Sequence, residues 1–367
     1  MGETTLRGHG LRIGHLEPGE ANAITDVAGV RVGHVTVSRD EPVPPEGRGT
    51  ARTGVTAILP GTGASVFRCP VPAGVAALNG AGELTGFLQV SEWGLIETPV
   101  YLTSTMAVGR VFDGAVAVAC AADAAVGVDD VVIPVVGECD DSWLNDARTV
   151  QVEAADAARA VAAARGGTIE QGCVGAGTGM VAFGWKGGIG SSSRLVPDVD
   201  ATIGVLVLAN FGAARDLRID GVPAFPTIGD GRDPRPPAGS CIAIVATDAP
   251  LDAAQLERLA RRVGLGLARV GSVAHHGSGE IFLAFSTGAA EREERPPVRV
   301  ERATVPDGHL DPLFAAVVEA TEEAVLNALW AAVDTTGREG RLVRALPHEP
   351  VVALLRAHGR LQARTTG

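Results

Sequence analysis

The feature that most constrains the fold is the alternation of short apolar runs with segments of helical spacing. Apolar runs typical of buried strands occupy residues 53–59, 100–105, 131–136, 201–208 and 240–247. Segments with helical character occupy residues 106–122, 150–165, 248–267, 310–333 and 347–359. Such alternation predicts layered sheets covered by helices, so we expect a single α/β domain over residues 1–367.

Glycine supports a fold with many short connections. The 48 glycines among 367 residues are roughly twice the usual share, which predicts many tight turns. We interpret residues 1–20 as a polar arm. The alternation of apolar and polar residues at 25–37 predicts a strand that is entered through a turn. Residues 175–190 match neither the Walker nor the dinucleotide-binding spacing, so we interpret them as a glycine-punctuated hairpin.

Composition excludes several classes of function. A net charge of −12 argues against binding a phosphate backbone, and 4% aromatic residues argue against a surface that stacks bases. No apolar run approaches the roughly 20 residues of a membrane span. The five cysteines are odd in number and form no CxxC pair, and no secretory signal is visible. We therefore expect a cytoplasmic protein with reduced thiols.

A glycine–serine junction, Gly239-Ser240, lies where a loop rich in glycine and proline meets an apolar run. If the chain were cut there, the nitrogen of Ser240 would become an α-amine with a pKa of about 7.7–8.0. That amine could take the proton of its own hydroxyl, so one residue would supply both nucleophile and base. Gly239 suits a cut because it tolerates strained geometry. Gly-Ser also occurs at Ser191, Ser272 and Ser278, so the pair alone is a weak signal.

Other polar residues are ambiguous from sequence alone. Ser278 and Glu280 are two apart at the start of a predicted strand, so both side chains share one face and form either a polar relay or a water-facing edge. Asn210 ends a strand, where turn chemistry explains it without a catalytic role. Residues 138–141 hold three carboxylates, which favour a solvated acidic loop over a metal site. We interpret the adjacent His275 and His276 as structural.

The combination of motifs resembles the DmpA-like aminopeptidases, a family that includes the β-peptidyl aminopeptidases. The resemblance covers nearly the whole chain. It rests on the motifs at residues 25–34, 78–86, 143–146, 175–180 and 319–329, together with the Gly239-Ser240 junction. It implies an αββα four-layer sandwich like that of the N-terminal-nucleophile hydrolases, with a different strand connectivity. It also implies self-cleavage between Gly239 and Ser240 into an α-chain (1–239) and a β-chain (240–367).

The resemblance also implies a role for each candidate residue. Ser240 would be the nucleophile of both self-processing and peptide hydrolysis, and Ser278 and Glu280 would orient and polarise it. Asn210 would help to hold the oxyanion, a contribution of about 10²–10³ in rate. Glu138 would bind the free ammonium of the substrate. Asp140 stands where some members carry a tyrosine that assists the oxyanion, which leaves that contribution and the substrate preference open.

We therefore expect a self-processing serine aminopeptidase that forms an acyl-enzyme on Ser240 and needs no metal or cofactor. Its substrates would be small peptides or aminoacyl amides or esters, with the choice between α-, β- and D-amino substrates open. A homo-oligomer of αβ units is expected from the family. Two alternatives remain: an acyltransferase of the ornithine-acetyltransferase type, whose nucleophile is usually threonine, and an uncleaved, non-catalytic binding protein of the same fold.

Overall fold

A computed structural model describes residues 5–61, 65–229, 239–288 and 304–361. Its centre is two facing sheets. The four-stranded sheet has the order β1 (Arg31–Asp40), β2 (Thr50–Leu59), β5 (Val100–Ser104), β6 (Val135–Cys139). The six-stranded sheet has the order β4 (Leu95–Ile96), β3 (Val71–Gly80), β14 (Ser278–Ser286), β13 (Gly239–Thr247), β10 (Ala201–Asn210), β9 (Gly188–Val196). Only β5–β6 and β13–β14 pair in parallel within these sheets.

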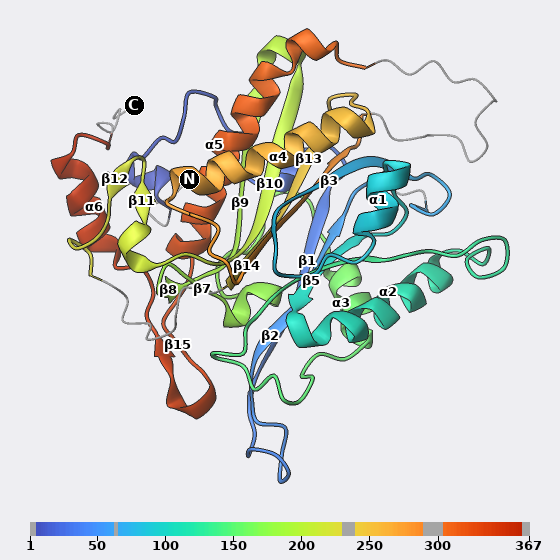
Figure 1. Ribbon diagram of the computed structural model, residues 1–367, viewed down its shortest axis with the longest axis horizontal. Coiled ribbons are helices and arrows are strands. Elements are labelled where there is room, and N and C mark those ends of the chain that lie inside the picture. Colours follow the sequence, from blue (N-terminus) through green and yellow to red (C-terminus); the bar gives the residue numbers. More distant parts are fainter. Residues whose placement is uncertain (1–4, 62–64, 230–238, 289–303, 362–367) are drawn as a thin grey trace.

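Helices cover the outer face of each sheet (Figure 1). On the six-stranded sheet, α4 (Ala253–Arg269) lies over β3 and β14, and α5 (Asp311–Trp330) lies over β9 and β10. On the four-stranded sheet, α2 (Val108–Ala122) packs on β5 and β6, and α3 (Ala155–Ala163) packs on β1 and β2. The αββα layering predicted from the resemblance is confirmed. The short α1 (Phe87–Trp93) and the C-terminal α6 (His348–Ala357) lie outside these layers.

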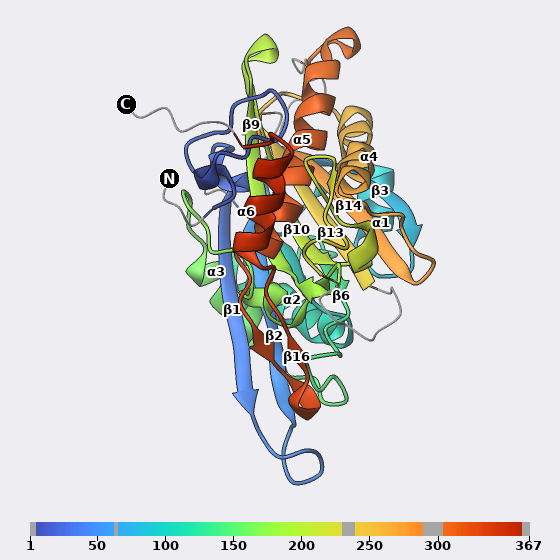
Figure 2. The same cartoon turned by 90° about the vertical axis from the view of Figure 1, so that its left-hand side faces the viewer.

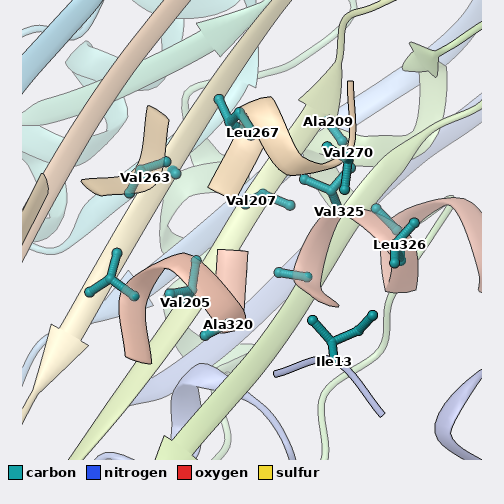
Figure 3. Close-up of a cluster of buried hydrophobic side chains, with 14 of the residues drawn as sticks. Ile13, Val205, Val207, Ala209, Val263, Leu267, Val270, Ala320, Val325 and Leu326 are labelled. Atoms are coloured by element: carbon teal, nitrogen blue, oxygen red, sulfur yellow. The ribbon is translucent and has the colours of Figure 1, made fainter. Parts of the chain in front are cut away.

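The buried side chains follow the same layers because alternate residues of a strand point to opposite faces. Along β13, Ile242 and Ile244 join the core between the two sheets. Cys241 and Ala243 join the core beneath α4 and α5. Figure 3 shows part of that second core, with Val205 and other residues of β10 facing side chains of both helices.

Three two-stranded hairpins complete the described strands: β7 (Val181–Ala182) with β8 (Trp185–Lys186), β11 (Arg218–Ile219) with β12 (Val222–Pro223), and β15 (Thr335–Thr336) with β16 (Leu342–Val343). The last hairpin lies beside the lower end of β1 and β2 (Figure 2). Arg52 on β2 donates from Nε to the carbonyl of Thr336 over 2.8 Å. A segment near the C-terminus is thereby anchored to a strand near the N-terminus.

Several predicted boundaries are wrong. The expected polar arm, residues 1–20, contributes Leu6, Leu11 and Ile13 to the core, and Arg7 pairs with Glu323 of α5 over 2.7 Å. The segment expected as a strand at 131–136 enters its strand only at Val135; before it, Val131 and Ile133 are exposed and Val132 is buried. The predicted helix at 150–165 is limited to α3. The hairpin expected at 175–190 is present as β7–β8, preceded by a 3₁₀ turn at Gly175–Gly179.

One segment bears on the membrane prediction. Within the described residues, Thr105–Ala122 is long and apolar enough to cross a membrane by length and composition alone, although only 28% of its residues are buried. The segment contains Arg110 and Asp113, and it packs on β5, β6 and α3 as an outer-layer helix. Its outward side combines Arg110 and Asp113 with small residues such as Ala117 and Ala121.

Candidate active site

A cavity of about 890 Å³ lies where β13 begins and where β6 and β10 end. Its walls come from segments far apart in the sequence. It is lined by Ala81, Gly82, Glu83, Thr105, Met106, Glu138, Asp140, Ser142, Trp143, Ala147, Arg148, Asn210, Gly239, Ser240, Gly277, Arg338 and Arg341. Four sequence candidates, Ser240, Gly239, Asn210 and Glu138, therefore meet in one cavity.

Ser240 is the second residue of β13, between two neighbouring strands. It pairs with Asn210 of β10 on one side and with Gly279 of β14 on the other. Its Oγ accepts a hydrogen bond from the Gly279 N–H over 3.3 Å, and the residue is only 5% exposed. The hydroxyl is thus held on the inter-sheet face of β13, at the wall of the cavity.

The residue before the serine must be glycine for a steric reason. A Cβ built on Gly239 would lie 1.7 Å from the backbone oxygen of Asn210, far inside any van der Waals contact. Because Asn210 pairs with Ser240 of β13 and Gly239 pairs with Ser278 of β14, neither backbone can shift without disturbing a ladder. Glycine is therefore required at position 239 because the backbone of Asn210 comes so close, and glycine also tolerates strained geometry at the bond to Ser240.

The Asn210 amide has a fixed orientation. Its Oδ1 accepts the Val181 N–H over 2.8 Å, and its Nδ2 donates to the carbonyl of Asp140 over 2.8 Å. Since an amide nitrogen carries two protons, one N–H remains for a group in the cavity. The prediction that Asn210 serves only a turn is wrong, because the residue is paired within β10 and is 1% exposed.

Glu138 is a buried carboxylate at the cavity wall, 3% exposed. Its Oε1 accepts the Glu83 N–H over 2.9 Å, and its Oε2 accepts from the Thr105 hydroxyl. Burial raises the pKa of Glu138, while these two hydrogen bonds act in the opposite direction. A buried carboxylate of this kind is stabilised by an incoming cation.

Ser278 and Glu280 lie on the opposite face of the sheet from the Ser240 side chain. The register places Glu280 beside Cys241 and Ser278 beside Gly239, so their side chains point toward the helices. Ser278 Oγ donates to Glu280 Oε1, and both residues are buried, so the alternative of a water-facing strand edge is wrong. Neither residue is among the described residues that line the cavity.

Glu280 retains an unused acceptor. Its Oε2 is buried and has no hydrogen-bond partner among the residues that the structure describes. Burial raises the pKa of Glu280, and the bond from Ser278 lowers it. The pair can therefore influence Ser240 through the backbone between the strands, not by touching a substrate.

The three carboxylates at 138–141 do not converge. Asp140 is exposed and accepts the Ser142 N–H over 2.8 Å. Asp141 is fully buried and accepts from Ser104 and Asn145. The expected solvated acidic loop is thus wrong for Glu138 and Asp141. Within the described ranges, no three histidine, cysteine or acidic side chains are grouped to hold a metal ion.

Sequence reasoning missed part of the site. Thr105 and the Glu83 backbone hold Glu138, and the Val181 backbone orients Asn210. Arg148, Arg338 and Arg341 also line the cavity. Charged residues outside an apolar run carry no sequence signal that joins them to Ser240. The two adjacent histidines, His275 and His276, lie in the turn before β14, and the His275 carbonyl accepts from Asn79.

A family model described as Peptidase family S58 matches residues 22–343. The chain belongs to peptidase family S58. The beta-peptidyl aminopeptidase BapA of Sphingosinicella microcystinivorans is 40% identical over 372 residues, covering 95% of this chain and 91% of that relative.

Solved structures agree with this membership. The L-aminopeptidase D-Ala-esterase/amidase of Ochrobactrum anthropi, described as a prototype for the serine aminopeptidases and a new variant of the Ntn hydrolase fold, superposes with a TM-score of 0.90. It is 38% identical, and the match covers 98% of this chain and 100% of that one. A beta-aminopeptidase of Burkholderia sp. gives a TM-score of 0.89 at 39% identity, over 98% and 99% of the two chains.

As a member of family S58, the chain is a hydrolase of the serine aminopeptidase type with the variant N-terminal-nucleophile fold. This assignment favours the peptidase over both alternatives weighed from the sequence. No tyrosine is among the described residues of this S58 member that line the cavity. Its single tyrosine, Tyr101, is fully buried and does not line the cavity, so no tyrosine hydroxyl replaces the one that some relatives carry at the position of Asp140.

Proposed function

We propose that this aminopeptidase matures by cutting itself between Gly239 and Ser240. The observation that carries the proposal is the meeting of Ser240, Asn210 and Glu138 in one cavity, with Gly239 at its wall. Ser240 Oγ attacks the Gly239 carbonyl, the C–N bond breaks, and the nitrogen of Ser240 gains a proton. Water then hydrolyses the resulting ester, leaving a carboxylate on Gly239 and a free α-amine on Ser240.

The two fragments would remain one molecule after the cut. β13 belongs to the fragment 240–367 and lies between β10 of the fragment 1–239 and β14. Both α4 and α5 of the smaller fragment pack on strands of the larger one. Cutting one peptide bond at the start of β13 therefore leaves the core intact.

In the mature enzyme, the α-amine of Ser240 is the base that activates its own hydroxyl. Ser240 sits beside Gly279, directly between Ser278 and Glu280. The unpartnered Oε2 of Glu280 offers an acceptor for the new amine, and the bond from Ser278 holds the carboxylate in place. In this role Ser278 and Glu280 are positioning residues that set the protonation of the amine.

The substrate would be a small peptide, amide or ester with a free amine, placed with its ammonium on Glu138 and its carbonyl on Ser240. The remaining N–H of Asn210 would hold the oxyanion of the tetrahedral intermediate. The leaving amine departs, and water hydrolyses the acyl group from Ser240. The chain's own residues supply every group in this scheme.

Copies of the αβ unit would associate through the outward side of α2. Only 28% of Thr105–Ala122 is buried, and the loop that follows it exposes the apolar side chains of Val128, Val131 and Ile133 by 80%, 68% and 46%. Apolar surfaces of this extent mark interfaces between proteins. Sedimentation should show an oligomer that Val128→Glu with Val131→Glu dissociates; a wild-type protein that sediments as one unit would contradict the association.

Self-cleavage and catalysis are tested with two matched serine variants. Wild-type protein should give two bands on a denaturing gel and hydrolyse alanine p-nitroanilide, whereas Ser240→Ala should give one band and no hydrolysis. Ser272→Ala is the control, because Ser272 also follows a glycine but does not line the cavity. It should behave like the wild type. A Ser240→Ala protein that is still cut, or still active, would overturn the proposal.

A further inference from the structure

The cavity is lined by basic as well as acidic side chains. The acidic lining residues are Glu83, Glu138 and Asp140. The basic lining residues are Arg148, which follows β6 in the chain, and Arg338 and Arg341, which lie in the turn between β15 and β16. Although the chain carries a net charge of −12, three arginines gather in this cavity and equal its lining carboxylates in number. The proposed function uses the acidic side of this lining and leaves the arginines unexplained.

The arginines are fixed by the fold. The Arg338 N–H donates to the Leu144 carbonyl over 2.7 Å, which ties the turn between β15 and β16 to the segment after β6. Arg341 lies over the Trp143 ring, 4.2 Å from its centroid, and donates to the Trp143 carbonyl over 3.3 Å. The turn between β15 and β16 therefore forms part of the cavity lining through Arg338 and Arg341.

The arginines are incompletely neutralised. Arg148 pairs with Asp146 through Nε and Nη2, at 2.8 and 2.6 Å. Arg338 and Arg341 both pair with the same carboxylate, Glu339. Three guanidinium groups thus share two carboxylates, which leaves one excess positive charge.

Donors also remain unused. Nη1 of Arg148 and Nη1 of Arg338 donate none of the hydrogen bonds found among the described residues. Both side chains retain exposed area, 57% for Arg148 and 24% for Arg338. A guanidinium with a free N–H and one excess charge is a binding site for a carboxylate.

We infer that this arginine wall, Arg148, Arg338 and Arg341, binds the C-terminal carboxylate of the substrate's leaving group. The inference rests on the proposed function and names its substrate class: short zwitterionic peptides, with the ammonium on Glu138 and the carboxylate on the arginine wall. A cavity of about 890 Å³ has room for more than the single residue that an aminoacyl amide presents. The enzyme is then foremost a dipeptidase-like aminopeptidase, and amides and esters are poorer substrates.

The test compares a dipeptide with its C-terminal amide, alanylalanine and alanylalanine amide, or their β-alanyl analogues if these are cleaved faster. Wild-type kcat/KM should favour the free acid by about tenfold. Because exposed ion pairs are weak, Arg338→Gln should lower this preference about threefold and Arg338→Glu should abolish or invert it. Arg344→Gln is the control, since Arg344 pairs with Asp334 on the surface and does not line the cavity. It should leave the preference unchanged.

The outcomes separate the two proposals. Equal kcat/KM for acid and amide in an enzyme that is cut and hydrolyses alanine p-nitroanilide would overturn the arginine subsite and leave the proposed function standing. An acid preference that Arg338→Glu does not reduce would also overturn it. A protein that is neither cut nor active on the anilide would overturn the proposed function and this inference with it.

Discussion

Replacing Glu138 by glutamine removes one negative charge from the cavity while keeping its shape. The glutamine oxygen can accept the Glu83 N–H, and its NH₂ group can donate to the Thr105 hydroxyl, which is free to reverse its role. Both anchoring contacts of the side chain therefore survive. What is lost is the partner of the substrate's ammonium group.

The size of the loss follows from charge and burial. Two unit charges about 4 Å apart attract by about 4 kcal/mol at the effective dielectric constant of a protein surface. Part of this is offset by desolvation of the ammonium, and truncating one partner of a buried charge pair costs about 2–5 kcal/mol. With Glu138 3% exposed, we expect about 2–3 kcal/mol, which corresponds to a fall in kcat/KM of about 30- to 150-fold, mainly through KM.

The assay is steady-state hydrolysis of alanine p-nitroanilide, with self-cleavage as an internal control. The Gly239 carbonyl has no free amine next to it, so Glu138→Gln should still be cut at the wild-type rate. Glu83→Gln is the matched variant, because its exposed side chain lines the same cavity; it should change KM less than about threefold. An unchanged KM in Glu138→Gln, or an equal effect in both variants, would refute the ammonium role.

Three further predictions concern the strands and buried carboxylates around the site. Gly239→Ala places a Cβ 1.7 Å from the Asn210 backbone oxygen, so it should lower the free energy of unfolding by about 2–3 kcal/mol and stop self-cleavage. Denaturant titration measures the stability and a denaturing gel measures the cleavage. A variant that is as stable as the wild type and is still cut would contradict this prediction. Glu280→Gln removes a negative charge near the α-amine of Ser240, which should lower the pKa of that amine. The rising limb of the plot of kcat against pH should therefore shift to lower pH, and an unshifted limb would argue against the positioning role of Glu280. Burial raises the pKa of Asp141 to about 6 from an ordinary value of 3.8, so the folded state keeps its proton to higher pH than the unfolded state and stability falls as pH rises between these values. Asp141→Asn should therefore stabilise the protein by about 1–2 kcal/mol at pH 8 and by little at pH 4, and equal effects on the melting temperature at both pH values would refute this.

Strands with continuous apolar sequence could be predicted because burial on both faces requires it. The run from Ser240 to Thr247 became β13, and the pattern at 310–333 became α5. Boundaries were harder, since local signals compete. The sequence predicted a helix from residue 248, yet Asp252 caps α4 by accepting the Gln255 N–H, while Asp248 accepts from the Thr202 N–H on a neighbouring strand.

The site could be predicted only in part. The Ser278–Glu280 hydrogen bond follows from alternation along one strand, which sequence reveals. That this pair faces away from the Ser240 side chain depends on the register between β13 and β14, which the sequence does not specify. The arginine wall depends on a turn between β15 and β16 that reaches across the molecule, a long-range contact with no local pattern.

The most direct test of self-processing is N-terminal sequencing of the smaller fragment from an active preparation. Cleavage at the proposed bond predicts the sequence Ser-Cys-Ile-Ala, beginning at Ser240. An active enzyme that remains one chain of 37.4 kDa, or whose smaller fragment begins at another residue, would contradict the account.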